Sequence, residues 1–463
     1  MSAKCLYAGA LALLAFPPPA SASTSELFEE RTRCLAYVEF YVQREVDRQA
    51  GEGVALVLNE SGLLVTLSNV FPDWLPPDRI RDLRVFPANN PEPTGLSADY
   101  LGQDVVNGWH YLRLDDPEAA AAYLDPVSGY GSGAPSIGEP VWGIGLTGAR
   151  MDYLPYYREG AVSAMQPLPL DTWFATTEVS VTGGPVFLAD GRFAGWAGRP
   201  MPEERDMWIG QEYFRATMRN PDESYMFLAA EVFLEEAGRR VPENPAGGPR
   251  PWIGVSGTEP LDAETARFMG LTDQGAVVIS EVLPETPAAE SGLEDRDIVL
   301  EIEGEPMPRL RPQAVLQRYF ERRILASPIG EPLSLTVLRG KERRELTVSP
   351  TESPMGLKKA PLRYFEDLGL TLRATVVRDL LQRREDWREA DGVIVNFIRP
   401  NSPAAGAELQ PGDWIREIGG EAVEGFEEAT ARLEDLAADA GVEEIVFLVK
   451  RGNETTVLRL RKP

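Results

Sequence analysis

The chain has 463 residues, and its 46 basic and 72 acidic side chains give a formal net charge of −26. Such an excess of acid repels phosphate backbones and anionic lipid surfaces, which argues against nucleic acid as a partner. A hydrophobic fraction of 43% and a charged fraction of 25% are ordinary for globular proteins, and the length suggests about three domains of roughly 150 residues.

Residues 1–22 have the pattern of a secretory signal peptide. Lys4 precedes an apolar run from Leu6 to Phe16, and Ala20-Ser21-Ala22 supplies small residues for cleavage. The run is shorter than the roughly 20 apolar residues that span a bilayer, and no later segment reaches that length. We therefore expect export to the periplasm or the medium, with no membrane span. Cys34 is then the only cysteine left, so no internal disulfide is expected.

Residues 23–241 are predicted to form mostly short strands. The segment Gly53 to Leu58 reads as a strand, Asn59 to Gly62 as a turn and Leu63 to Thr66 as the next strand. The end of this segment is predicted to be helical instead, since Ala229 to Arg239 has the apolar spacing of a terminal helix.

Two segments rich in Pro and Gly, 242–250 and 351–362, are predicted linkers. The segments that follow them, 251–350 and 363–463, repeat each other. Thr286-Pro287-Ala288-Ala289 is echoed by Ser402-Pro403-Ala404-Ala405, and Asp295-Arg296-Asp297-Ile298-Val299 by Pro411-Gly412-Asp413-Trp414-Ile415. Each copy is predicted to combine short strands with a short helix and a longer one, the latter at about Pro312–Arg323 and Phe426–Ala438. The fold class is therefore mainly β with α+β modules.

The repeated module resembles a PDZ domain of the kind found in HtrA-type proteases. The Ser/Thr-Pro-Ala-Ala helix start and the Gly-Asp-x-Ile turn carry the resemblance, together with a loop at the first strand. A glycine in that loop lets backbone amides converge on a terminal carboxylate, while a peptide adds to the sheet edge beside the longer helix. The peptide-binding residues that this resemblance implies are Arg250, Trp252, Ile253, Gly254, Val255, Leu316 and Tyr319 in the first copy, and Leu368, Gly369 and Leu370 in the second.

The second copy has an alternative interpretation. Glu366 and Asp367 lie beside its loop, and adjacent acids oppose a carboxylate, so this module could serve only for packing or assembly. Arg250 favours binding by the first copy.

Residues 23–241 resemble the trypsin-like domain of the HtrA family. Three segments carry the resemblance: Leu64 to Val70, Trp109 to Leu114, and Val181-Thr182-Gly183-Gly184-Pro185. The resemblance implies a trypsin-like double β-barrel followed by two PDZ domains, and assembly into a trimer or larger oligomer.

The catalytic triad of that family is degenerate in this sequence. Its histidine, aspartate and serine fall on Asn69, Gly108 and Thr182. Asn69 cannot act as a general base, and Thr182 needs a base before it can attack a carbonyl. Ser180 and Val181 mark the possible oxyanion region, where Ser180 replaces the usual glycine.

The leading hypothesis is a pseudoprotease that binds peptides or unfolded segments of exported proteins, as an adaptor or chaperone-like subunit. The alternative is an active endopeptidase in which His110, the only histidine, activates Thr182. A third possibility is co-assembly with an active homologue. We expect no metal and no cofactor.

Overall fold

The computed structural model describes residues 23–71, 75–89, 94–198, 204–209, 212–217, 225–311, 315–386, 388 and 391–463, with the backbone alone at 204–209, 212–217 and Lys358. The predicted signal peptide, residues 1–22, lies outside the described residues, as does Pro312 at the predicted start of the first long helix.

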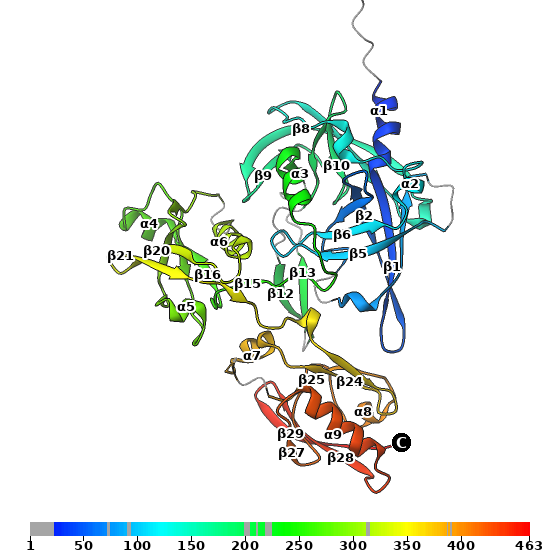
Figure 1. Cartoon of the computed structure of the whole chain (residues 1–463), viewed down its shortest axis with the longest axis vertical. Helices are drawn as coiled ribbons and strands as arrows, with labels where there is room; N and C mark the ends of the chain where they lie inside the picture. Colours follow the sequence, from blue (N-terminus) through cyan, green and yellow to red (C-terminus); the bar gives the residue numbers. More distant parts are fainter. Residues whose placement is uncertain are drawn as a thin grey trace, which may run out of the picture.

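The first part of the chain forms two closed barrels, which confirms the predicted double β-barrel (Figure 1). Helix α1 (Thr24–Arg31), opened by a capping box between Ser23 and Glu26, and a 3-10 turn precede them. The first barrel has the order β1-β2-β3-β6-β5-β4 and the second β10-β11-β14-β9-β8-β7. Their strands are β1 (Leu35–Gln43), β2 (Arg48–Val57), β3 (Leu63–Thr66), β4 (Ile80–Pro87), β5 (Leu96–Gln103), β6 (His110–Leu114), β7 (Pro140–Leu146), β8 (Pro155–Pro167), β9 (Asp171–Ala175), β10 (Pro185–Leu188), β11 (Phe193–Trp196) and β14 (Met226–Ala229).

Smaller elements complete this domain. Helix α2 (Pro117–Ala120) joins the barrels, β12 (Glu204–Ile209) and β13 (Glu212–Thr217) pair with each other, and α3 (Ala230–Arg239) follows β14. One apolar cluster contains Val65 and Trp109 of the first barrel, Trp196 of the second and Phe233 of α3. This shared core fixes the two barrels against each other and against α3.

The two carboxyl-terminal modules have the same sheet topology. The first has the order β16-β17-β18-β20-β21, and the second repeats it as β24-β25-β26-β28-β29 with β23 added at the β24 edge. The first contains β15 (Pro251–Trp252), β16 (Thr258–Pro260), α4 (Ala263–Phe268), β17 (Val277–Ile279), α5 (Pro287–Glu290), β18 (Ile298–Ile302), β19 (Glu305–Pro306), α6 (Val315–Ala326), β20 (Leu333–Arg339), β21 (Glu342–Val348) and β22 (Thr351–Glu352). The second contains β23 (Leu362–Phe365), β24 (Leu370–Ala374), α7 (Val377–Arg383), β25 (Val393–Ile398), α8 (Pro403–Gly406), β26 (Trp414–Ile418), β27 (Glu421–Ala422), α9 (Phe426–Ala438), β28 (Glu444–Arg451) and β29 (Glu454–Arg461).

The repeat extends to individual interactions. Thr286 and Ser402 are the N-caps of α5 and α8, and each accepts a hydrogen bond from the amide three residues later. The buried Asp297 accepts two hydrogen bonds from Arg339, at 2.8 and 2.7 Å, and Asp413 accepts the same pair from Arg451, at 2.6 and 2.7 Å. The first ion pair connects the turn before β18 to the end of β20, and the second connects the turn before β26 to the end of β28.

The predicted linkers contain some regular structure. β22 lies in the segment 351–362, and pairs with β15 of the first module. Leu362, the last residue of that segment, begins β23.

The first module docks on the second barrel through its long helix α6. Leu168, in the turn between β8 and β9, is buried in the same apolar cluster as Ile253, Leu316 and Phe320 of the module. Phe174 of β9 packs against that cluster too.

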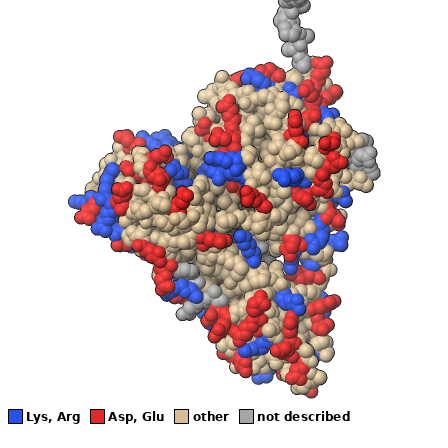
Figure 2. Space-filling model, in the orientation of Figure 1, with Lys and Arg blue, Asp and Glu red and all other residues tan. Residues whose placement is uncertain are grey.

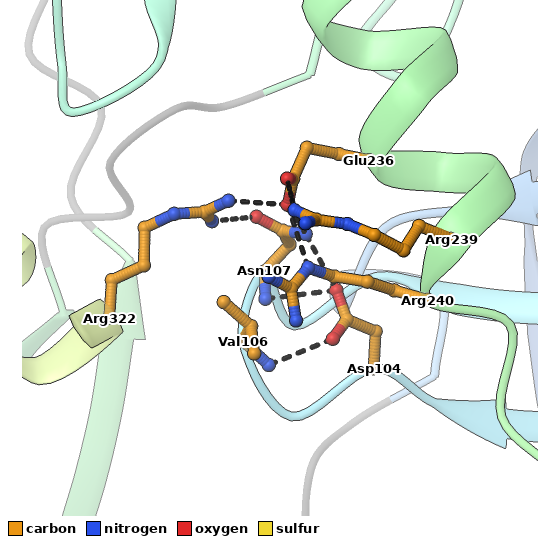
Figure 3. A network of polar contacts seen from close by, with 7 residues as sticks. All are labelled: Asp104, Val106, Asn107, Glu236, Arg239, Arg240 and Arg322. Carbon is orange, nitrogen blue, oxygen red and sulfur yellow. Dashed lines mark hydrogen bonds and ion pairs between the residues drawn. The ribbon is translucent and has the colours of Figure 1, made fainter. Parts of the chain in front are cut away.

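A polar network reinforces this contact (Figure 3). Arg322 extends from α6 to the carboxylate of Glu236 on α3 and to the side-chain oxygen of Asn107 in the β5–β6 turn. Glu236 also accepts a 2.7 Å hydrogen bond from Arg240 and pairs with Arg239. Burial alone would raise the pKa of Glu236, but the hydrogen bond from Arg240 and the charge of Arg322 outweigh it and lower the pKa to about 2.

Acidic and basic side chains are interspersed over the face shown in Figure 2, and they form no continuous basic area in that view.

Candidate functional site

The turn that carries Thr182 lies where the two barrels meet. A Cβ atom on its neighbour Gly183 would be 3.5 Å from the carbonyl oxygen of Val54 and 3.9 Å from Leu67, both in the first barrel. The indole of Trp196 holds the turn by donating a 2.7 Å hydrogen bond to the carbonyl of Gly183. Leu67 is two residues before Asn69, so the serine-like and histidine-like segments of the sequence lie together. Thr182 is half-buried and Asn69 is exposed.

Gly108 stands just before β6 with a φ of +73°, in a turn that its amide closes with a 2.9 Å hydrogen bond to the carbonyl of Asp104. The buried Asp104 is the carboxylate of this turn. It accepts hydrogen bonds from the amides of Val106 and Asn107, at 2.9 and 3.0 Å. Burial raises the pKa of Asp104, and those hydrogen bonds only partly offset the effect. Asp104 therefore holds its own turn together.

His110 is fully buried inside the first barrel. Its Nδ1 lies 2.7 Å from the hydroxyl oxygen of Tyr100, and its ring stacks on Phe71 with centroids 5.6 Å apart. Its neighbours Trp109 and Tyr111 belong to the cluster between the barrels. Because side chains alternate along a strand, His110 points to the barrel interior and away from the interface that holds the Thr182 turn.

The predicted oxyanion region packs against the wall of the second barrel. The hydroxyl of Ser180 is buried and donates a 2.9 Å hydrogen bond to the carbonyl of Ile144. The amide of Val181 is directed to the same carbonyl at 3.5 Å. Ser180 does not adopt a positive φ, unlike Gly183 at +89°. The Val181 amide therefore faces a backbone carbonyl of its own domain.

The carboxyl-terminal modules and the chain as a whole have known relatives. PDZ-domain family models match residues 252–349 and 394–462. The chain is 29% identical over 358 residues to a probable periplasmic serine endoprotease, DegP-like, of Halomonas elongata, covering 75% of this chain and 68% of that protein. It is 24% identical over 363 residues to the DegP-like protein of Pseudomonas putida strain W619, with the same coverage.

The chain is an HtrA-like protein with two PDZ domains. Its structure is also similar to the HtrA-type protease AlgW with tripeptide (18% identity, 72% of this chain and 99% of that chain, TM-score 0.47). A serine endoprotease from Yersinia pestis matches with 16% identity, 72% and 99% coverage and a TM-score of 0.43. The two PDZ domains are called PDZ1 and PDZ2 below.

PDZ1 brings together the groove residues that the sequence predicts. Ile253 and Leu316 are buried in one cluster, with Val255 and Tyr319 partly buried against it. Gly254 has a φ of +88°, and a Cβ there would lie 2.2 Å from the Cβ of Thr286, so only glycine fits. The loop is fixed by hydrogen bonds from the amide of Ala288 to the carbonyl of Ile253, at 2.8 Å, and from the amide of Leu283 to that of Gly254, at 2.9 Å.

The outer edge of this loop and of β16 faces α6. Among the described strands, β16 pairs only with β17. The side chain of Gln317 on α6 donates a hydrogen bond to the carbonyl of Thr258 in β16. Arg250 is exposed and pairs with Glu321 of α6 at 3.1 Å, while Trp252 is half-buried. Gln317 has no signal in the sequence, because no local pattern shows that a helix residue reaches across to a strand edge.

PDZ2 holds its loop in the same way. The amide of Ala404 donates to the carbonyl of Leu368 at 3.0 Å, and the amide of Arg399 donates to that of Gly369 at 2.8 Å. Leu368 and Leu370 are buried, and Gly369 has a φ of +67°. The loop geometry of the two PDZ domains is therefore equivalent.

Within the described parts of the chain, no group of three or more His, Cys, Asp or Glu side chains is arranged to hold a metal ion. No helix in those parts has both the length and the apolar character needed to cross a bilayer.

Proposed function

We propose that this protein is an exported, HtrA-like pseudoprotease that binds peptide segments through PDZ1 and does not hydrolyse them. The position of His110 carries the proposal. The only imidazole of the chain is enclosed in the first barrel beside Tyr100, on the opposite face of β6 from the residues that line the interface between the barrels.

The chemistry of serine-type hydrolysis requires a base that contacts the attacking hydroxyl and a group that orients the base. Thr182 retains a hydroxyl. The position of the family's catalytic histidine, however, holds the amide side chain of Asn69, and the position of its aspartate holds Gly108, which has no side chain. Loss of both the base and its orienting group removes most of the catalytic advantage. No observation favours the alternative in which His110 activates Thr182.

Peptide capture is supported by the geometry of PDZ1. Its loop has the left-handed glycine that turns backbone amides outward, and the amide of Gly254 donates to no backbone carbonyl among the described residues. A ligand's terminal carboxylate can accept from such amides, while its strand adds to the edge of β16 and its apolar side chains contact Val255 and Tyr319. The Gln317 side chain must then release the Thr258 carbonyl.

Binding without hydrolysis leads to an adaptor or chaperone-like role for exported proteins. The periplasmic location of that role is supported by the relatives, which are named as periplasmic serine endoproteases. Assembly into a homo-oligomer, trimeric or larger, or into a mixed oligomer with an active homologue, is part of the proposal. Light scattering of the purified protein and co-purification from its source distinguish these assemblies.

Binding is tested by titrating the full mature chain with fluorescent peptides that carry an apolar carboxyl-terminal residue. Val255→Glu puts a carboxylate at the loop and should weaken binding at least about tenfold, or about 1.4 kcal/mol. Glu259→Gln, an exposed change on the neighbouring strand β16, is the matched control and should bind like the native chain. Equal affinity of the native chain and Val255→Glu would rule out PDZ1 as the binding site.

A further inference from the structure

PDZ2 has a strand that PDZ1 lacks. In the β-sheet of PDZ2, β23 pairs with the edge of β24, whereas the equivalent strand β16 of PDZ1 pairs only with β17 among the described strands. The equivalence is fixed by register, because Val255 pairs with Val282 and Leu370 with Ile398, and these partners each lie five residues after the matching residues Val277 and Val393. β23 therefore lies on the edge to which a peptide would add.

The direction of β23 is that of a bound ligand. It runs antiparallel to β24 and ends at the loop, so that Phe365 pairs with Leu370. The amide of Gly369 donates a 2.8 Å hydrogen bond to the carbonyl of Phe365 and a longer one, at 3.2 Å, to the carbonyl of Glu366. This is the amide that would otherwise hold a terminal carboxylate, and the Phe365 carbonyl takes the place of that group.

The side chains of β23 also take the positions of ligand side chains. Phe365 is 8% exposed and belongs to the PDZ2 core cluster with Leu370 and Leu433. Two residues earlier, Arg363 points to α9 and pairs with Glu434 at 2.6 Å. Apolar burial at the last position and an ion pair at the position two residues before it together define the recognition site.

We propose that β23 is an intramolecular ligand of PDZ2, which closes this groove to external peptides and leaves PDZ1 to bind them. The assignment to PDZ1 rests on the proposed function, whereas the closure of PDZ2 does not. The chemistry of β23 also identifies the class of peptide that would fit an opened PDZ2: a chain ending in Arg-x-Phe with a free carboxylate.

Tethering explains why the groove stays closed. β23 is joined to β24 by only four residues, 366–369, so its effective concentration at the edge is on the order of millimolar or higher. An external peptide of equal intrinsic affinity at about 10 µM would be disfavoured roughly 100-fold. Weakening β23 should therefore open PDZ2 to a peptide that the native chain excludes.

The test uses hydrogen exchange of the full mature chain, read by mass spectrometry, with the peptide Lys-Ala-Pro-Leu-Arg-Tyr-Phe carrying a free carboxyl terminus. In the native chain the peptide should leave exchange at 370–374 unchanged. In the variant Arg363→Glu/Phe365→Ala it should slow exchange there, with an apparent affinity at least about tenfold higher than that of native PDZ2. The peptide Lys-Ala-Pro-Leu-Glu-Tyr-Ala with a free carboxyl terminus, which lacks both recognition side chains, is the control and should give no protection.

Because Phe365 is buried, Arg363→Glu alone is the second variant. It changes an exposed side chain, so the fold is retained, and it should give a smaller gain in the same direction. Peptide-induced protection at 370–374 in the native chain at the concentration that suffices for the variants would overturn the proposal, and so would the lack of any gain in both variants. Exchange at 253–258 reports PDZ1 separately, so a failure of the proposed function there is distinct from a failure at β24.

Discussion

Removal of Arg322 should weaken the docking of PDZ1 on the protease-like domain, which comprises the two barrels and α3. Its side chain is 16% exposed, and it contacts Glu236, which is 8% exposed and sits on another domain. Breaking a buried ion pair by removing one partner costs about 3–5 kcal/mol. Glu236 keeps Arg240 and Arg239, so we expect a lower cost for Arg322→Met, about 2 kcal/mol, or roughly a 30-fold shift of the docking equilibrium.

Limited proteolysis in the segment 242–250, together with hydrogen exchange of α6 and α3, measures this shift. Arg239→Met is the matched control, because Arg239 pairs with the same carboxylate but is 57% exposed. A surface ion pair of this kind contributes less than about 1 kcal/mol. An increase in cleavage and exchange by Arg322→Met that is no larger than the increase by Arg239→Met would refute the role of Arg322 in docking.

Three other predictions follow from single groups. The pKa of Glu236 is lowered from 4.5 to about 2, so its stabilising contribution is complete above pH 4.5 and is lost as the pH falls toward 2. The protection of α6, measured as its exchange rate relative to the intrinsic amide rate at each pH, should fall over that range in the native chain and fall less in Glu236→Gln. Cys34 is fully buried and burial raises the pKa of its thiol, so a thiol reagent should modify it only as fast as the domain unfolds, and modification within seconds would contradict its placement. Arg339→Met and Arg451→Met should each destabilise their own PDZ domain by about 2–3 kcal/mol in calorimetry, since each leaves a buried aspartate without its cation, and the other PDZ domain should be unaffected.

Local patterns predicted the elements of this fold well. The sequence places the long helix of PDZ2 at Phe426–Ala438, where α9 lies, and the terminal helix of the protease-like domain within one residue of α3. The Pro-Ala-Ala helix starts were predictable because Thr286 and Ser402 are N-caps followed by proline, a signal that depends only on neighbouring residues.

Features that depend on distant residues were not predictable. The sequence predicts a strand at Trp109 to Leu114, but it does not show that the side chain of His110 points into the barrel interior, toward Tyr100 and Phe71. The turn after β23 contains Asp367 and Gly369, but these residues also match a peptide-binding loop, and the pairing of β23 depends on the open edge of β24. The contact of Arg322 with Glu236 joins residues 86 positions apart and has no local signature.

The central claim, binding without hydrolysis, is tested most directly by a cleavage assay. The mature chain is incubated with an unfolded protein substrate, beside Thr182→Ala and beside an active HtrA-type protease, and products are followed by mass spectrometry. We predict that both the native chain and Thr182→Ala leave the substrate intact, while the active protease degrades it. Cleavage by the native chain that Thr182→Ala abolishes would contradict this prediction.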